Sequence, residues 1–172
     1  MTLRGRHNST DTLVETASFL VVRLGGCYLA FPAAGVRGVL ANEEAGHSEA
    51  VTAMGSVYPP IDLAQRLSVV ADLSGSGMRT VLYSNGRLQG AIRVEQVVGL
   101  TDVERKDCFP LPAQFRCDEQ HWFMGMMVYR DHLALVLNPS WTLGESDGAM
   151  PEPVGQMGQP TEITETAVGG SC

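Results

Sequence analysis

Apolar and polar residues in this chain follow the two-residue period of β-strands over several segments. Leu88, Ile92 and Val94 alternate with polar neighbours, which predicts a strand with one buried face. Residues 122–129 are apolar at almost every position, and after a polar dipeptide a second apolar run covers residues 132–137. We expect these two runs to form a hairpin that is buried on both faces. Helical periodicity is scarce, so the pattern predicts an all-β protein with few short helices.

One arrangement of strands and turns occurs twice. In residues 18–40 and again in residues 79–100, an apolar strand is followed by a turn, a second strand, a short bend and a valine-containing strand. The turns contain Gly25-Gly26 and Asn85-Gly86, dipeptides that suit tight hairpins because the central residues of such turns have positive φ. The repeat predicts two small barrels packed on each other. Such a body offers edges and a groove for binding rather than a catalytic pocket.

Polar segments set the predicted boundaries of the domain. Residues 1–17 have no sustained period and are expected to form a flexible leader. Residues 144–172 are rich in Gly, Pro, Glu, Thr and Gln and contain no aromatic residue, which predicts a disordered acidic tail. The body between them, residues 18–143, is expected to be one domain. Its first half covers about residues 18–73 and its second half about residues 78–143.

Composition and charge exclude several classes of function. The chain has 172 residues, of which 44% are hydrophobic, so it can build a proper core. Its net charge of −7 is concentrated in the tail, and the nearly neutral body lacks the basic stripe that nucleic-acid binding requires. No apolar run is long enough to insert into a membrane, and the first residues do not resemble a signal peptide. We therefore expect a cytoplasmic protein whose cysteines are reduced.

Two patterns that could indicate an enzyme are weak. Residues 144–148 match G-x-S-x-G, but the prolines that follow cannot build the helix which that motif requires, so we interpret the match as chance. Cys108, Cys117, His121 and His132 could be aligned as zinc ligands, yet only one pair among them has a suitable spacing. A small metal- or thiol-dependent enzyme on a β-barrel stays as a minor alternative. We predict no catalytic residue, no metal and no cofactor.

Four stretches in order resemble the CheW-like family of chemotaxis coupling domains. These stretches are Phe19 to Leu40, with its opening hairpin; Pro59-Pro60-Ile61-Asp62-Leu63 with Arg66; Ile92 to Val97, followed by Phe109-Pro110-Leu111-Pro112; and Gly125 to Asn138, with the closing hairpin. The resemblance covers the whole body. Each motif is soft on its own, and their order together with the internal repeat makes the match specific.

The resemblance implies a fold and a function. It implies two pseudo-symmetric five-stranded SH3-like barrels around a shared core, and no catalytic activity. Members of this family connect the cytoplasmic tip of chemoreceptors, which lies in the groove between the barrels, to the regulatory domain of the CheA-type histidine kinase. This chain would be an adaptor of that kind, cytoplasmic and recruited to membrane-bound receptor arrays. It would not bind nucleic acid, and it would not insert directly into a membrane.

Ten residues are the candidate partner contacts that the resemblance implies. Five valines match the groove, and two arginines flank the same strands, where they could contact a partner at the rim. The alternative is that the valines have only a structural role in the core and that the arginines are solvated. Three further residues belong to the segment that ends in the V-P-x-x-D-L strand. For the aspartate among them, the alternative is that its side chain accepts hydrogen bonds from the backbone amides of a turn. The candidates are Val36, Val39, Val94, Val97 and Val98; Arg37 and Arg93; and Met54, Gly55 and Asp62.

Three features depart from the family pattern. Met54 stands where the N-L-R-G motif has its functional arginine, and Gly38 replaces the glutamate of V-x-E-[VI]. The loop before Gly55 is also shorter than usual and lacks the P-x-[FWY]-[IVL]-x-G turn. All three departures fall in the first half of the domain, where partner specificity is expected. We therefore expect a divergent coupler with an unusual partner. The alternative is a localisation or sequestering module that binds only one of the receptor and the kinase.

Overall fold

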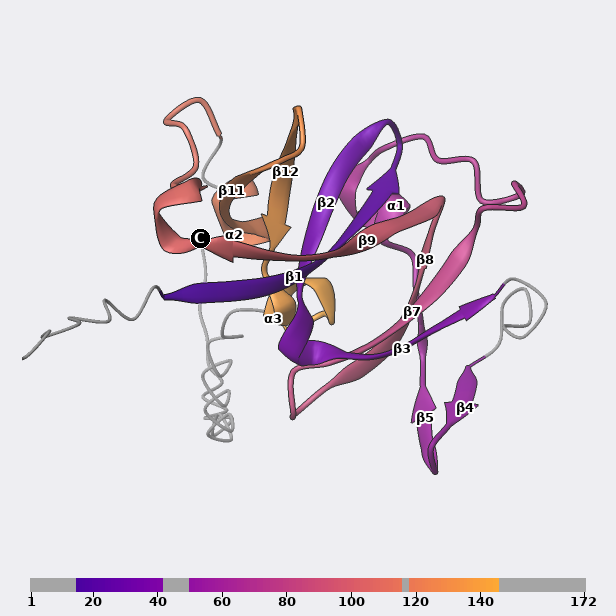
Figure 1. Ribbon diagram of the computed structural model, residues 1–172. Helices are drawn as coiled ribbons and strands as arrows, with labels where there is room; N and C mark the ends of the chain where they lie inside the picture. Colours follow the sequence, from indigo (N-terminus) through magenta and orange to yellow (C-terminus); the bar gives the residue numbers. More distant parts are fainter. Residues whose placement is uncertain (1–14, 42–49, 116–117, 146–172) are drawn as a thin grey trace, which may run out of the picture.

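The computed structural model describes residues 15–41, 50–115 and 118–145, and more than half of these residues are in strands (Figure 1). The all-β class is confirmed. The predicted acidic tail lies outside the described residues from residue 146 onward, and the predicted leader does so up to residue 14. The last part of that leader is already strand, because Thr16 pairs with Glu104.

The larger sheet has six strands and includes the first strand of the described chain. All neighbours in it are antiparallel except β12 and β2, which run parallel. Across the sheet the order is β10 (Cys108–Phe109), β11 (Phe123–Tyr129), β12 (His132–Leu137), β2 (Cys27–Pro32), β1 (Thr16–Leu24) and β9 (Gln96–Glu104).

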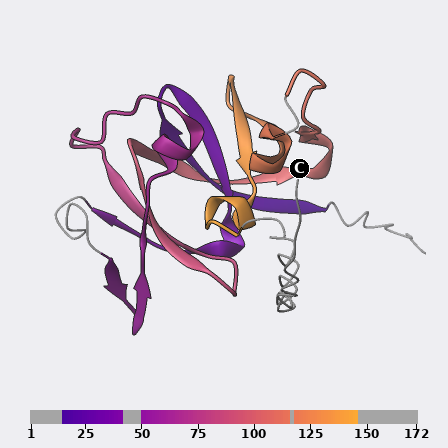
Figure 2. The same cartoon turned by 180° about the vertical axis from the view of Figure 1, so that it is seen from behind.

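The remaining strands form a four-stranded sheet and a two-stranded ribbon. The four-stranded sheet has the order β3 (Val36–Ala41), β7 (Arg79–Ser84), β8 (Gln89–Val94) and β6 (Pro60–Ile61), and the ribbon pairs β4 (Val51–Ala53) with β5 (Ser56–Tyr58). The described helices are short: η1 (Ala33–Gly35), α1 (Leu63–Leu67), η2 (Arg105–Asp107), α2 (Glu119–Trp122) and α3 (Pro139–Thr142). Helices α1 and α3 lie on the side that Figure 2 turns toward the viewer.

The two larger sheets each combine strands from both halves of the sequence. The two repeats fold as β1–β2–β3 and β7–β8–β9, yet β1 pairs with β9 of the other repeat and β3 pairs with β7. The sheets have six, four and two strands, so the predicted five-stranded barrels are not reproduced as separate hydrogen-bonded units. The reason is strand exchange, because the closing strand of each repeat pairs with the opening strand of the other.

Strand β1 contributes to two cores because its two faces are both covered. Leu20, Val22 and Leu24 face a large core shared with the four-stranded sheet and the helices, to which Phe31, Leu63, Val81, Tyr83, Ile92, Val94, Phe123 and Leu137 also belong. Phe19 and Val21 face a smaller core within the six-stranded sheet, which contains Val103, Met127, Tyr129 and Val136. The alternation along one strand therefore connects the two parts of the molecule.

The two predicted turns differ in structure. Gly25 and Gly26 have φ values of 58° and 78°, and Leu24 pairs with Cys27, so this turn has the two central residues that the sequence predicts. The second prediction was wrong in register. Strands β7 and β8 are last paired at Ser84 and Gln89, which leaves a four-residue connection. The Asn85 side chain accepts hydrogen bonds from the backbone N–H groups of residues 87 and 88, and only Gly86 has positive φ there.

The prediction that the β11–β12 hairpin is buried on both faces is also wrong. One face of β11 is buried through Phe123, Met127 and Tyr129. On the other face Met124 and Val128 are more than half exposed, and Leu133 of β12 is equally exposed. Because the described chain covers this face only partly, the hairpin presents apolar side chains to solvent.

Candidate partner-binding surfaces

Strand β3 carries three of the predicted contact residues at an edge of the four-stranded sheet. Arg37 and Val39 are exposed, and Val36 is partly buried against the large core. The alternation arises because β3 has only one neighbouring strand, β7, and only one of its faces packs on the body. Arg37 and Val39 are therefore accessible to a partner, while Val36 contributes mainly to packing.

The predicted contacts on β8 and β9 are less accessible. Val94 is fully buried in the large core, so the prediction that it contacts a partner is wrong. Arg93 is partly buried, and Val97 and Val98 are partly buried against the large and the small core respectively. The valines thus point into different cores.

Met54 and Gly55 form the tip of the β4–β5 ribbon. Their φ values are 52° and 75°, and Ala53 pairs with Ser56, so the two residues make a two-residue turn of the kind that favours positive φ. The Met54 side chain is 78% exposed. Its Cε atom lies 3.9 Å from the position that a Cβ on Gly38 would occupy. The two positions that depart from the family pattern are therefore neighbours in space.

Asp62 has a structural role at the start of α1. Its carboxylate accepts a hydrogen bond of 2.9 Å from the backbone N–H of Gln65, which is the interaction of a helix N-cap. In the next turn the Arg66 guanidinium donates to the carbonyl oxygens of Trp141 and Thr142, at 2.6 and 2.8 Å. It also lies over the Trp141 ring, 5.4 Å from its centroid. The Arg66 contacts join α1 to α3, and Asp62 caps the helix while its side chain stays exposed.

The most extensive apolar surface was missed at the sequence level. We define the β10–β12 apolar face as Phe109, Met124, Met126, Val128 and Leu133. Phe109 pairs with Met126, Val128 pairs with Leu133, and positions two apart on β11 share one side of the sheet, so these side chains lie on the same face. All but Met126 are exposed. The sequence did contain a signal, because β11 is apolar on both of its faces. The described fold covers only one of these faces, so the other remains exposed.

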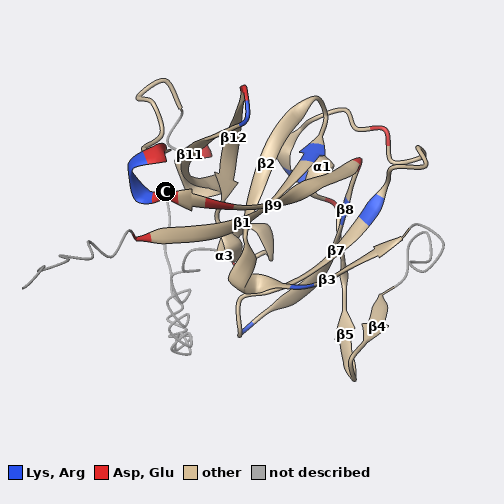
Figure 3. Cartoon of the chain, viewed as in Figure 1, with Lys and Arg blue, Asp and Glu red and all other residues tan. Residues whose placement is uncertain are grey.

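A hollow adjoins this face between β9 and the end of β11. It has a volume of about 630 Å³, and its lining includes Leu100, Phe109 and Val128. Acidic side chains of β9 and η2, namely Asp102, Glu104 and Asp107, line it as well, and Figure 3 shows the acidic colour along that end of β9. Apolar groups bordered by carboxylates suit a protein surface with complementary apolar and basic groups.

The cysteines and histidines that the sequence aligns as zinc ligands are only partly within the described residues. Residues 15–41, 50–115 and 118–145 hold no group of three or more His, Cys, Asp or Glu side chains that could bind a metal, and Cys117 lies outside them. Cys27 is exposed and Cys108 is partly buried, both as free thiols. Burial raises the pKa of Cys108, and Asp107 raises it further, which disfavours a reactive thiolate. Within the same residues, no helix is long and apolar enough to cross a membrane.

Comparison with known proteins agrees with this architecture. The family model described as CheW-like domain matches residues 18–146. Among solved structures, the scaffolding protein TtCheW from Thermoanaerobacter tengcongensis is similar, with a TM-score of 0.61 and 14% sequence identity over 72% of this chain and 90% of that one. No curated protein sequence matches. The chain belongs to the CheW-like family. It is accordingly a scaffolding adaptor of chemotaxis signal transduction and not an enzyme.

Proposed function

We propose that this chain couples chemoreceptors to a CheA-type histidine kinase in a bacterial chemosensory pathway. Family membership supports an adaptor, and the proposal adds the two partners and the coupling between them. The receptor tip and the regulatory domain of the kinase would occupy different surfaces. The chain would act in the cytoplasm at membrane-bound receptor arrays.

The observation that carries this proposal is the β10–β12 apolar face. Exposed apolar patches on soluble proteins mark interaction sites, because their burial against a partner removes them from water. Leu133, Val128 and Met124 are each more than half exposed on one side of a sheet. A scaffold needs such a preformed surface, since it acts only by binding. A flat sheet face of this kind suits a folded domain such as the regulatory domain of the kinase.

The exposed part of β3 and the ribbon tip form a second surface on the other sheet. Arg37, Val39 and Met54 are exposed there. We assign the receptor tip to this side, where Arg37 and Val39 lie on β3 of the four-stranded sheet. Two surfaces on different sheets would allow both partners to be held at once, as coupling requires.

A localisation or sequestering module that binds only one partner is the second candidate. The contact between Met54 and Gly38 favours it, because the first half of the domain lacks the charged residues of the family pattern at this place. A kinase or receptor that depends on those charges would not bind the first surface. The β10–β12 apolar face would then retain its partner alone.

Affinity capture with the full chain distinguishes these functions. The tagged protein would be incubated with an extract of its own cells, and the captured proteins identified by mass spectrometry. Recovery of both a chemoreceptor and a CheA-type kinase supports coupling. Recovery of only one supports the localisation module, and recovery of neither contradicts both. Leu133→Lys is the matched variant, since it places a charge on the apolar face without changing the buried core.

A further inference from the structure

A hollow lies where β3 begins, beside the β7–β8 connection. Its volume is about 300 Å³. Tyr83 forms its base, because this side chain is buried and donates a hydrogen bond of 3.2 Å to the carbonyl oxygen of Pro32. The ring packs so closely that a Cβ on Gly35 would approach its Cζ atom to 2.4 Å. Pro32, Ala34 and Pro139 complete a rigid wall that is mostly apolar.

Arg37 provides an uncompensated positive charge at the edge of this hollow. The side chain lines the hollow and is exposed, and the described residues give it neither an ion pair nor a hydrogen bond. By contrast Arg23, Arg87 and Arg105 each pair with a glutamate. Figure 3 shows basic positions both at the start of β3 and at the β7–β8 connection. An anionic group would therefore be favoured at this place.

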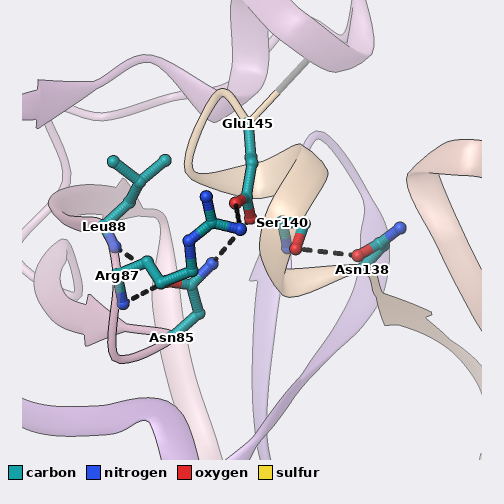
Figure 4. Close-up of polar contacts among 6 residues, drawn as sticks. All are labelled: Asn85, Arg87, Leu88, Asn138, Ser140 and Glu145. Carbon is teal, nitrogen blue, oxygen red and sulfur yellow. Dashed lines mark hydrogen bonds and ion pairs between the residues drawn. The ribbon is translucent and has the colours of Figure 1, made fainter. Parts of the chain in front are cut away.

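The chain leaves the described body beside the same hollow. The Glu145 carboxylate forms an ion pair of 2.7 Å with Arg87 and accepts a hydrogen bond of 3.1 Å from Asn85, as Figure 4 shows. The backbone N–H of Glu145 donates to the carbonyl oxygen of Ser140 at 2.9 Å. Asn85 itself lines the hollow. The segment that follows residue 145 therefore begins next to a residue that lines the hollow.

We propose that residues 146–153 of this chain dock in the hollow as an extended segment, with Asp147 or Glu152 paired with Arg37. Residues 146–172 contain acidic residues but neither Lys nor Arg, so their charge is complementary to Arg37. Met150-Pro151-Glu152-Pro153 favours extended polyproline conformation, which packs against apolar walls containing proline and aromatic rings. Eight extended residues reach roughly 26 Å, and Asn85, which bonds to Glu145, lines the same hollow as Arg37.

Docking of this segment would cover Arg37 and limit access to Val39 on the same strand. A partner that uses β3 would have to displace the segment, so its apparent affinity would be lowered. This consequence for partner binding rests on the proposed function. The docking itself does not, because it concerns only contacts within one chain.

Hydrogen exchange of the full chain, followed by mass spectrometry, tests the docking. In Asp147→Asn/Glu152→Gln, peptides covering residues 34–38 and 83–88 should exchange faster, by about threefold, as expected for loss of an exposed charge pair. Glu162→Gln/Glu165→Gln removes the same charge farther along the chain and should leave these peptides unchanged. Equal exchange in wild type and both variants would overturn the proposal, as would an effect of the distal variant alone.

Exchanging the charges of Arg37 and its proposed partners distinguishes loss of docking from misfolding of a variant. Arg37→Glu should accelerate exchange in the same two peptides, and Arg23→Glu is the control at another exposed arginine. Combining Arg37→Glu with Asp147→Lys/Glu152→Lys should restore the wild-type rates, because the pair is re-formed with reversed signs. Failure of this rescue would contradict the docking. Protection that rises with protein concentration would also contradict it, since the segment would then come from a second copy.

Discussion

Met54 lies against Gly38, with its Cε atom 3.9 Å from the point where a side chain on Gly38 would begin. The resemblance to the family places an arginine and a glutamate at these two positions. The two departures are therefore one local change, in which a pair of charges is exchanged for a thioether and a hydrogen. A partner that meets this surface contacts an apolar site. At this place the chain differs from the family pattern by the loss of charge.

Replacement of Met54 by asparagine should stabilise the protein. Met54 has a φ of 52°, a conformation that asparagine tolerates better than other side chains. Asn-Gly is also the preferred pair for this turn, so the free energy of unfolding should rise by about 0.5–1 kcal/mol. Chemical denaturation measures the change, with Val70→Asn as the control because Val70 is 96% exposed and lies outside the strands. A loss of stability in Met54→Asn would contradict this account of the turn.

Val94 and Val39 should respond differently to the same substitution. Val94 is fully buried, so Val94→Ala should lower the free energy of unfolding by about 2 kcal/mol through loss of packing. Val39 is 40% exposed, and Val39→Ala should change stability by less than about 0.5 kcal/mol. Urea denaturation of both variants provides the measurement. Similar values for the two would mean that the assignment of Val94 to the core is mistaken.

Arg66 should contribute more to stability than a typical exposed arginine. It donates two hydrogen bonds to the end of α3 and stacks on Trp141, so Arg66→Ala should cost about 1–2 kcal/mol. Arg87→Ala removes only an exposed ion pair and should cost less than about 0.5 kcal/mol. Thermal and chemical denaturation of the two variants compare them directly. Equal stability of the two would show that the junction of α1 and α3 is not held by Arg66.

Stability at alkaline pH should depend on Tyr83. Burial raises the pKa of Tyr83 to about 12 from an ordinary value of 10.0, although Arg37 acts in the opposite direction. The unfolded chain therefore loses this proton first, and the free energy of unfolding falls as the pH rises from about 10 toward 12. In Tyr83→Phe that part of the decline should be absent. Denaturation at about pH 9 and about pH 11 tests this, and an equal decline in both proteins would exclude Tyr83 as the cause.

Features that depend on neighbouring residues could be predicted from the sequence. Gly25 and Gly26 fix their turn because positive φ is a local property of glycine. The β7–β8 connection shows the limit of this reasoning. There the Asn85 side chain accepts hydrogen bonds from backbone N–H groups and takes the place of the expected turn, a competition that the dipeptide alone does not reveal.

Features that depend on which strands cover which face could not be predicted. Val94 and Val39 are both strand valines, and Val94 lies inside the core only because the large core covers its face of β8. Similarly, Met124 and Leu133 look buried in an apolar run, but burial requires a covering layer, and periodicity contains no information about that layer. The structure therefore leaves the buried Val94 as a core residue and adds the exposed β10–β12 apolar face as a candidate binding surface.

Sedimentation velocity on three purified components tests the central claim most directly. The full chain would be mixed with the regulatory domain of a CheA-type kinase and a receptor tip fragment, both from the same cells. The account predicts a single ternary species, and it predicts that Leu133→Lys weakens kinase binding at least about tenfold, because a buried unpaired charge is costly. Val70→Lys should assemble like the wild type. Absence of both binary complexes, or unchanged assembly of Leu133→Lys, would contradict the adaptor surface described for this protein.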